Sequence, residues 1–461
     1  MRIVRLANFV GPQSGGLRTA LRELGIGYRE AGHDPVLIIP GERSSVEETA
    51  QGTVITVAAP VAPGLGGDYR AVFARRELSR LLADLKPDRI EVSDQLTLRW
   101  VARWARRNQV PAVMVAHESL TRLFTLPAGV PYKARWRNIV FHSRAFYRAA
   151  SWAATFLDRR SAREYDEVVA TTRWAASEFE AIDAPNVTLV TLGVDLDLFS
   201  PERYSEPVRA CYARPEQALL VHCGRLSMEK KPQRSIRALA DLRAAGTDAV
   251  LVVAGDGPLR PDLEEMASAA GLPVTFTGFI DDPKTLAGLL AAADADIAPG
   301  PVETFGLAAL EALACGTPVV ASGESALPEV LGDAGAAAEG EHFAAAVRQI
   351  LDRPEAGRRA AARRRAEAFG WTAAVSKFLA VHHAAEPQCA ECRKGRISSN
   401  DEDRHSRRLD HARHGRPRSR RRLAWLDTTS GRRADRPGTA QSRGNRRAVQ
   451  ARRAGSASGG S

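Results

Sequence analysis

The order of elements along the chain constrains the fold most: short apolar strands run into turns that contain glycine, and a helical pattern follows each turn. In the second half, strands are predicted at Ala218-Leu-Leu-Val-His-Cys-Gly224, Ala249-Val-Leu-Val-Val-Ala254 and Val274-Thr-Phe-Thr-Gly-Phe279. Buried strands that alternate with helices favour parallel sheets covered on both faces. The sequence therefore predicts an α/β protein.

The first half of the chain repeats this order. Arg2-Ile-Val-Arg-Leu-Ala7 is predicted as a strand, and Gly11-Pro-Gln-Ser-Gly-Gly16 as a glycine loop that opens a helix, although an ordinary tight turn is an alternative for this loop. Further strands are predicted at 35–39, 54–57, 89–92, 112–116, 168–171 and 187–191. With 461 residues, 44% of them hydrophobic, the chain has room for two doubly wound domains.

Glu303-Thr-Phe-Gly-Leu-Ala-Ala-Leu-Glu311 is the strongest candidate for a binding site. Helical residues advance about 100° each, so carboxylates eight positions apart are expected near one face of a helix. Free amides at the helix start near Gly306 favour a diphosphate, and carboxylates accept hydrogen bonds from sugar or ribose hydroxyls. A surface helix with two solvated glutamates is the alternative. Strands predicted on both sides place the motif where open α/β sheets bind their ligands.

Two cations and two glycine turns accompany this motif. Arg225 and Lys230 follow the strand that ends at Gly224, where they are suited to neutralise a leaving diphosphate; solvated surface charge is the alternative. Gly257, in the turn Gly255-Asp-Gly-Pro258, lets the backbone come close to a ligand. Phe279 ends the third strand, where backbone contacts to a nucleobase are expected.

In this order and spacing, these elements resemble the donor half of the retaining GT-B glycosyltransferases of family 4. The resemblance covers about residues 1–383 and implies two Rossmann-like domains that face a cleft. By match, it implies that Glu303 binds the sugar hydroxyls, that Glu311 binds the ribose, and that Arg225 and Lys230 bind the diphosphate.

The same resemblance assigns backbone contacts. Amides around Phe305, Gly306 and Leu307 would complete the phosphate site, and the loop at Gly16 resembles the family's acceptor and diphosphate loop. It also implies that no metal cofactor is needed and that the anomeric configuration is retained. Asp294-Ala-Asp296 resembles a metal-binding D-x-D only superficially, because it falls between a predicted helix and strand.

Within the family, several segments resemble the mannosyltransferases that elongate phosphatidylinositol mannosides. They are Gly15-Gly-Leu-Arg-Thr-Ala20, Glu91-Val-Ser-Asp94 with Leu96-Thr-Leu-Arg99, His222-Cys-Gly-Arg-Leu-Ser227 and Ala298-Pro-Gly-Pro301. This likeness implies GDP-mannose as the donor and a glycolipid as the acceptor. A UDP-sugar donor, another acceptor, or a nucleotide-sugar epimerase that uses no acceptor remain alternatives.

Two further side chains follow strands of the first half. His117 comes directly after the strand 112–116, and the family has a histidine at the end of the corresponding strand, close to the donor sugar; a structural histidine is the alternative. Asp94 is a candidate to bind an acceptor hydroxyl, or else to cap a helix that begins near Thr97.

Residues 132–163 combine positive charge with aromatic side chains. Eight Lys and Arg residues stand there against Asp158, and between the first and the last of them lie six aromatic residues that include Trp152 and Phe156. A cationic helix with an aromatic face suits an anionic membrane surface, and a core-packing helix with a solvated face is the alternative. No run of 18 apolar residues occurs and no signal peptide is evident, so we expect a cytoplasmic protein at the inner membrane face.

The basic excess of the chain belongs to its carboxyl-terminal tail. Residues 384–461 carry 20 Lys plus Arg and 8 Asp plus Glu, a net charge of +12, whereas residues 1–383 carry 45 against 46. The tail has almost no apolar periodicity, which predicts disorder. Three explanations of the tail compete: a reading-frame artefact, a tether for nucleic acid or membrane, and a metal site at Cys389 and Cys392. The artefact is preferred, and the metal site is disfavoured because a lone C-x-x-C is a weak signal.

These observations give a domain map. Residues 1–197 are expected to form the acceptor domain, completed by a closing helix within 368–383, and residues 198–367 the donor domain. The five cysteines are expected to be reduced thiols.

Overall fold

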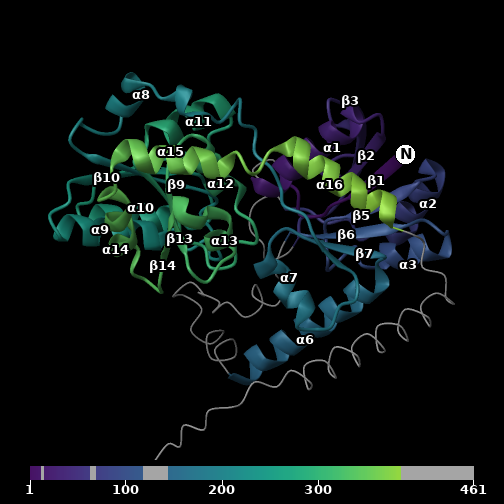
Figure 1. Cartoon of the computed structure of the whole chain (residues 1–461). Coiled ribbons are helices and arrows are strands. Elements are labelled where there is room, and N and C mark those ends of the chain that lie inside the picture. Colours follow the sequence, from purple (N-terminus) through teal and green to yellow (C-terminus); the bar gives the residue numbers. More distant parts are fainter. Residues whose placement is uncertain (12–14, 63–68, 118–143, 386–461) are drawn as a thin grey trace, which may run out of the picture. The chain divides into compact units, whose positions relative to one another are not determined.

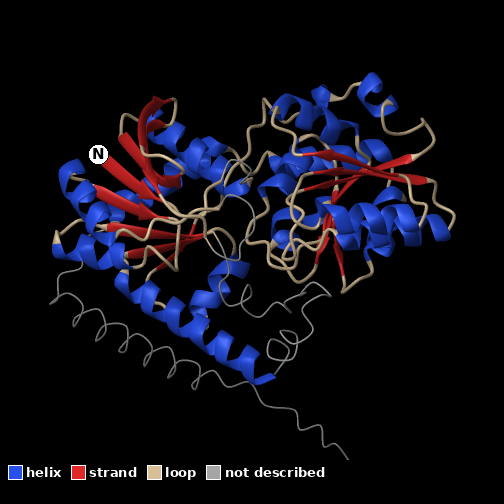
Figure 2. Ribbon diagram, turned by 180° about the vertical axis from the view of Figure 1, so that it is seen from behind, coloured by secondary structure: helices blue, strands red, loops and turns tan. Residues whose placement is uncertain are grey.

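The computed structural model describes residues 1–11, 15–62, 69–117 and 144–385, and for residues 144–151, 153 and 154 it describes the backbone alone. The described residues all belong to one compact unit. They form two separate sheets, each with helices on both sides (Figures 1 and 2).

The first sheet has eight described strands in the order β3-β4-β2-β1-β5-β6-β7-β8. The strands are β1 (Arg2–Leu6), β2 (Asp34–Gly41), β3 (Ser45–Thr49), β4 (Gly52–Ala58), β5 (Arg89–Val92), β6 (Ala112–Ala116), β7 (Glu167–Ala170) and β8 (Val187–Leu189). Its described helices are α1 (Gly16–Glu30), α2 (Arg75–Leu85), α3 (Trp100–Arg107), α6 (Arg144–Glu164) and α7 (Arg173–Glu180). All pairs are parallel except β3 with β4, a hairpin at the sheet edge.

The second sheet has six strands in the order β11-β10-β9-β12-β13-β14, all parallel. The strands are β9 (Ala218–Cys223), β10 (Ala249–Ala254), β11 (Val274–Gly278), β12 (Ala295–Ala298), β13 (Val319–Ser322) and β14 (Ala336–Ala338). The helices are α8 (Glu206–Ala210), α9 (Gln233–Ala244), α10 (Arg260–Ala269), α11 (Pro283–Ala292), α12 (Leu307–Ala314), α13 (Leu327–Leu331), α14 (Phe343–Leu351) and α15 (Glu355–Ala366).

Alternate residues of the central strands enter different hydrophobic clusters. Leu219 and Val221 of β9 belong to one buried cluster, while Leu220 between them belongs to another on the opposite face. Successive side chains of a strand point to opposite faces, so a strand covered on both sides must be apolar throughout. This explains why the predicted strands are continuous apolar runs.

The last described helix, α16 (Trp371–Ala384), packs on α1 of the first sheet, although it follows the elements of the second (Figure 1). An added Cβ at Gly27 of α1 would lie 2.3 Å from Val375, so glycine permits this close approach. Further along, the buried His382 Nε2 lies 3.1 Å from a carboxylate oxygen of Glu91. The expected closing helix is therefore present, while the exact domain boundaries stay predictions.

Glu91 anchors this junction. Its carboxylate accepts a hydrogen bond from Arg5 at 3.0 Å and another from the Tyr28 hydroxyl at 2.8 Å. Burial alone would raise the pKa of Glu91, but the charge of Arg5 and the hydrogen bond from His382 outweigh it and hold the pKa well below its usual value.

Candidate active site

The glycine between the two glutamates of the motif starts helix α12. Gly306 has φ +85°, and an added Cβ there would lie 2.2 Å from Leu327 Cδ2, so only glycine fits. Helix α12 begins at Leu307, so the predicted helix start near Gly306 is confirmed: Glu303 lies in the preceding turn and Glu311 in the second helical turn. The expectation that a rotation of about 100° per residue relates the two carboxylates is wrong, because Glu303 lies outside the helix. No side chain of the described residues caps the start of α12, which leaves its first amides available to an anion.

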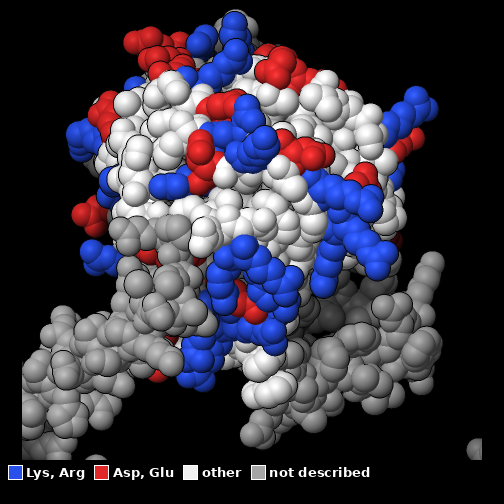
Figure 3. Space-filling view, turned by 90° about the vertical axis from the view of Figure 1, so that its right-hand side faces the viewer, with Lys and Arg blue, Asp and Glu red and all other residues white. Residues whose placement is uncertain are grey.

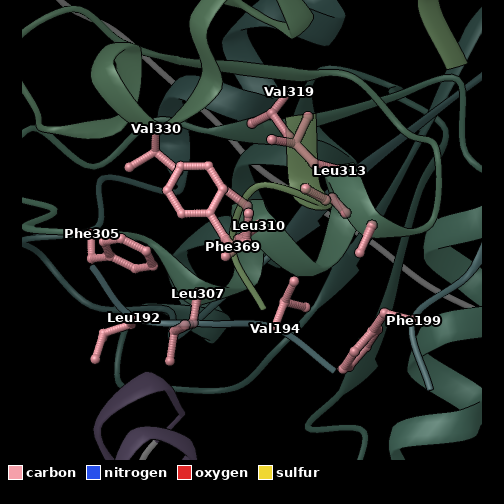
Figure 4. Packing of buried hydrophobic residues seen from close by; sticks show 14 of the residues in the cluster. Leu192, Val194, Phe199, Phe305, Leu307, Leu310, Leu313, Val319, Val330 and Phe369 are labelled. Carbon is pink, nitrogen blue, oxygen red and sulfur yellow. The ribbon is translucent and has the colours of Figure 1, made fainter. Parts of the chain in front are cut away.

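Phe305 and Leu307 contribute to the core rather than to a polar surface. Their side chains are 3% and 6% exposed and lie in one cluster with Leu192 and Phe369 (Figure 4). The rings of Phe305 and Phe369 meet edge to face at 6.0 Å. These side chains are therefore not exposed to a ligand, and the predicted binding of phosphate by the main-chain amides stays a prediction. This packing of Phe305 and Leu307 in the core fixes the start of α12.

The structure brings Lys230 and Glu303 together. Lys230 Nζ and Glu303 Oε2 form an ion pair, in which the side chains are 31% and 24% exposed. The Ala326 amide donates to the main-chain oxygen of Glu303 at 2.9 Å and fixes the turn. The first carboxylate of the motif is thus paired with one of the two predicted diphosphate-binding cations.

Arg225 is held from two sides. Its guanidinium donates to Glu229 Oε1 at 2.7 Å and to the Tyr69 hydroxyl, and lies 5.1 Å from the centre of the Tyr69 ring. Burial by itself would raise the pKa of Glu229, but Arg225, a hydrogen bond from Ser227 at 2.5 Å and Lys230 lower it overall. Glu229 is therefore ionised and orients the arginine.

Backbone turns approach the same region. Gly16, predicted to end a loop, is the first residue of α1 and lies against α12, since a Cβ added there would be 3.6 Å from Leu307 Cδ1. In the turn after β10, a Cβ at Gly257 would lie 2.5 Å from the Leu226 carbonyl oxygen, so glycine permits a close approach to the segment that carries Arg225. The predicted approach of this turn to a ligand stays a prediction. Phe279, just after β11, is 43% exposed.

Two buried acidic side chains, Glu311 on α12 and Asp296 on β12, have strongly shifted pKa values. Burial raises the pKa of Glu311 to about 8; Arg22 opposes this and the nearby Asp296 adds to it. Asp296, 1% exposed on β12, also has its pKa raised to about 8 by burial, against the opposing hydrogen bonds from the amides of Cys223 and Ile297. Both groups therefore hold a proton more readily than an exposed carboxyl does.

His117 follows β6 as expected. Its Nε2 atom is buried and has no hydrogen-bond partner among the described residues, and burial lowers the pKa of the ring to about 4. Its main-chain oxygen accepts a hydrogen bond of 2.6 Å from Thr304 Oγ1, next to Glu303. The imidazole is thus neutral at physiological pH. The main chain of the same residue contacts the glutamate motif.

Asp94 has a local structural role. Its carboxylate accepts hydrogen bonds from the amides of Leu96 at 2.7 Å and Thr97 at 3.0 Å, and from the Thr97 hydroxyl. The helix predicted near Thr97 begins instead at Trp100, because this turn precedes it. Asp94 therefore caps a turn, and its acceptor-binding role stays a prediction.

Asp294 is paired with two arginines. Its carboxylate accepts hydrogen bonds from Arg209 at 2.9 Å and Arg358 at 3.3 Å, and from the Leu219 amide at 2.8 Å. Across the described residues, no group of three or more His, Cys, Asp or Glu side chains is arranged to hold a metal ion.

Residues 15–195 match the family model of the glycosyl transferase 4-like domain, and residues 209–368 match that of the glycosyl transferases group 1. The chain is 50% identical over 387 residues to the GDP-mannose-dependent alpha-(1-6)-phosphatidylinositol dimannoside mannosyltransferase of Mycobacterium tuberculosis, covering 83% of this chain and 96% of the relative. The chain belongs to the group 1 glycosyltransferases. This glycosyltransferase is also 28% identical to a Mycobacterium tuberculosis glycogen synthase over 405 residues, or 81% of this chain and 92% of that one.

Solved structures share the fold of the glycosyltransferase. Sucrose-phosphate synthase from Thermosynechococcus elongatus matches with a TM-score of 0.66 at 20% identity, over 83% of this chain and 98% of that one. A glycosyltransferase involved in lipopolysaccharide biosynthesis matches with a TM-score of 0.58 at 18% identity, over 83% and 100%. The predicted GT-B architecture of two Rossmann-like domains is confirmed.

Sequence reasoning missed the residues that hydrogen-bond to the predicted site residues Arg225 and His117. Tyr69 and Thr304 carry no sequence signal, because their partners are 156 and 187 positions away. Glu229 was detectable, since it stands four positions after Arg225 and such a spacing allows an ion pair.

Proposed function

We propose that this glycosyltransferase moves mannose from GDP-mannose to a phosphatidylinositol mannoside, with retention of configuration and without a metal cofactor. The observation that carries the proposal is the 50% identity to the dimannoside mannosyltransferase over nearly the whole of that relative. The site geometry supports it, because two cations, a glycine-started helix and two carboxylates converge on one region.

The ion pairs of the site suggest how the donor binds. Lys230 is paired with Glu303 and Arg225 with Glu229, so the diphosphate must draw the two cations from carboxylates. Once Lys230 turns to phosphate, Glu303 is free to accept hydrogen bonds from the sugar hydroxyls. The charge that develops on the leaving diphosphate is then met by Arg225, Lys230 and the first amides of α12, which lowers the barrier.

The described part of α6 supports the proposed location at the inner face of the membrane. Trp152 and Phe156 are 71% and 49% exposed and stack at 5.7 Å, while Asp158 and Ala162 on the other side of the helix are buried. No described helix is long and apolar enough to cross a bilayer. The residues at 132–143 and the side chains of Arg144 and Arg148, which the sequence analysis included, lie outside the described part.

Arginines continue this exposed stripe. Arg159, Arg160 and Arg163 follow on α6, and Arg103 and Arg106 of α3 join them around Glu164. Figure 3 shows Lys and Arg side chains gathered around an acidic one on this face. Aromatic side chains beside cations suit the interface of an anionic bilayer.

Replacing the exposed Arg159 and Arg163 by Gln should weaken binding to anionic vesicles about thirtyfold, since each basic residue near such a surface contributes about 1 kcal/mol. Trp152→Ser should weaken it further. Sedimentation with vesicles measures the affinity, and Arg348→Gln with Arg364→Gln, two exposed arginines of the second domain, is the control. Equal losses in both pairs would remove this surface from the proposal.

Cutting the chain after Ala385 should leave folding and sugar transfer intact. Ala385 still packs in the core, so the cut is placed beyond it, and the removed residues lack an apolar pattern. We expect the free energy of unfolding to change by less than about 0.5 kcal/mol. A large loss in thermal melts or in activity would show that the tail packs on the enzyme.

Donor turnover with and without lipid tests the function. A transferase should release GDP from GDP-mannose in proportion to added phosphatidylinositol mannoside. An epimerase would turn over its sugar nucleotide without lipid, and a protein that acts through its basic tail would lose its activity in the truncated variant.

A further inference from the structure

Thr304, between Glu303 and Phe305, ties the motif to the first sheet. Its side chain is buried, and its hydroxyl donates to the main-chain oxygen of His117 at 2.6 Å. Its own main-chain oxygen accepts from the hydroxyls of Thr172 at 2.9 Å and Thr171 at 3.3 Å. One residue of the second domain is thus bonded to the carboxyl ends of both β6 and β7.

A second contact holds the same junction. The carboxylate of Glu329, on α13 of the second domain, accepts hydrogen bonds from the amides of Arg173 at 3.0 Å and Trp174 at 3.1 Å. These amides start helix α7, where a carboxylate is favourable. The Thr172 hydroxyl also accepts from the Ala175 amide at 3.1 Å, so it serves the helix start and Thr304 together.

We propose that Thr304 is a positioning residue that fixes Glu303 relative to His117. Glu303 is joined to Thr304 by a peptide bond, and His117 is held through its own carbonyl, so both are fixed without Thr304 touching the substrate. Misplacement of a reacting group by about 1 Å can cost a hundredfold in rate. The inference rests on the proposed function, because that function places Glu303 and His117 at the reacting sugar.

Thr304→Val tests this with nearly unchanged side-chain volume. We expect kcat for mannose transfer to fall about tenfold to a hundredfold. The affinity for GDP should stay within about twofold, because the diphosphate and ribose contacts assigned above do not involve the hydroxyl. Thr304→Ser retains the hydroxyl and should restore kcat.

Thr317→Val is the matched control. Its buried hydroxyl donates to the Leu290 carbonyl at 2.6 Å, entirely within the second domain. This variant should lose comparable thermal stability while keeping kcat. Equal kcat in Thr304→Val and Thr317→Val, or a failure of Thr304→Ser to restore it, would overturn the inference.

A readout without substrate separates this inference from the proposed function. In Thr304→Val, amide hydrogen exchange should accelerate in the segments 300–310 and 171–176, and in Thr317→Val it should not. If the wild-type enzyme transfers no mannose, the proposed function fails, and exchange still decides the role of Thr304. Unchanged exchange in Thr304→Val would overturn it.

Discussion

Glu303→Gln should lower turnover about a hundredfold while GDP binds as well as before, or more tightly. The loss follows from removing a charged contact to the transferred sugar that strengthens in the transition state. The retained affinity follows from the ion pair between Lys230 and Glu303, because Glu303 competes with the diphosphate for Lys230. Calorimetric titration with GDP and steady-state transfer rates measure the two quantities.

Glu339→Gln serves as the control, since Glu339 is an exposed glutamate of the same domain. It should leave both quantities unchanged. A Glu303→Gln enzyme that retains wild-type turnover would remove Glu303 from the sugar site. A large loss of GDP affinity would show instead that Glu303 holds the nucleotide.

Glu311→Gln should weaken GDP itself by about 1.5–3 kcal/mol, roughly ten- to hundredfold, because a charge-assisted hydrogen bond to the ribose is lost. The raised pKa of Glu311, about 8, adds a pH dependence. Ribose hydroxyls that donate to the carboxylate favour its ionised form, so the bound pKa is lower than the free one. GDP affinity should therefore rise with pH up to about 8 and level off above it, with proton release on binding.

Titrations of GDP in buffers of different ionisation enthalpy detect this proton. The comparison of the wild-type enzyme with Glu311→Gln separates the protons that Glu311 releases from those that Asp296 releases, since the pKa of Asp296 is raised similarly. Identical buffer dependence in both proteins would contradict the assignment of Glu311 to the ribose.

Most of the fold could be predicted because buried parallel strands leave an unmistakable signal. The strand 112–116, for example, has five apolar residues in a row and appears as β6 with the same bounds. The edge strand β3 was missed, since its residues Ser45–Thr49 are mostly polar and exposed. Strand β14, Ala336–Ala338, was missed because three alanines carry no strand preference of their own.

The site was predictable in its chemistry and less so in its geometry. Arg225, Lys230 and Glu303 were found because each follows the end of a strand. Their ion pairs were not found, because Lys230 and Glu303 stand 73 positions apart. The helix start near Gly306 was predicted, whereas the left-handed conformation of Gly306, which shapes the turn between Glu303 and the helix, is not revealed by sequence spacing.

The most direct test of the proposed function is transfer of radiolabelled mannose from GDP-mannose to a lipid extract that contains phosphatidylinositol dimannoside, with chromatography of the products. The proposal predicts that label enters a lipid one mannose larger than the acceptor, and that a UDP-sugar does not replace the donor. Label that stays in water-soluble products, or equal transfer from a UDP-sugar, would contradict it.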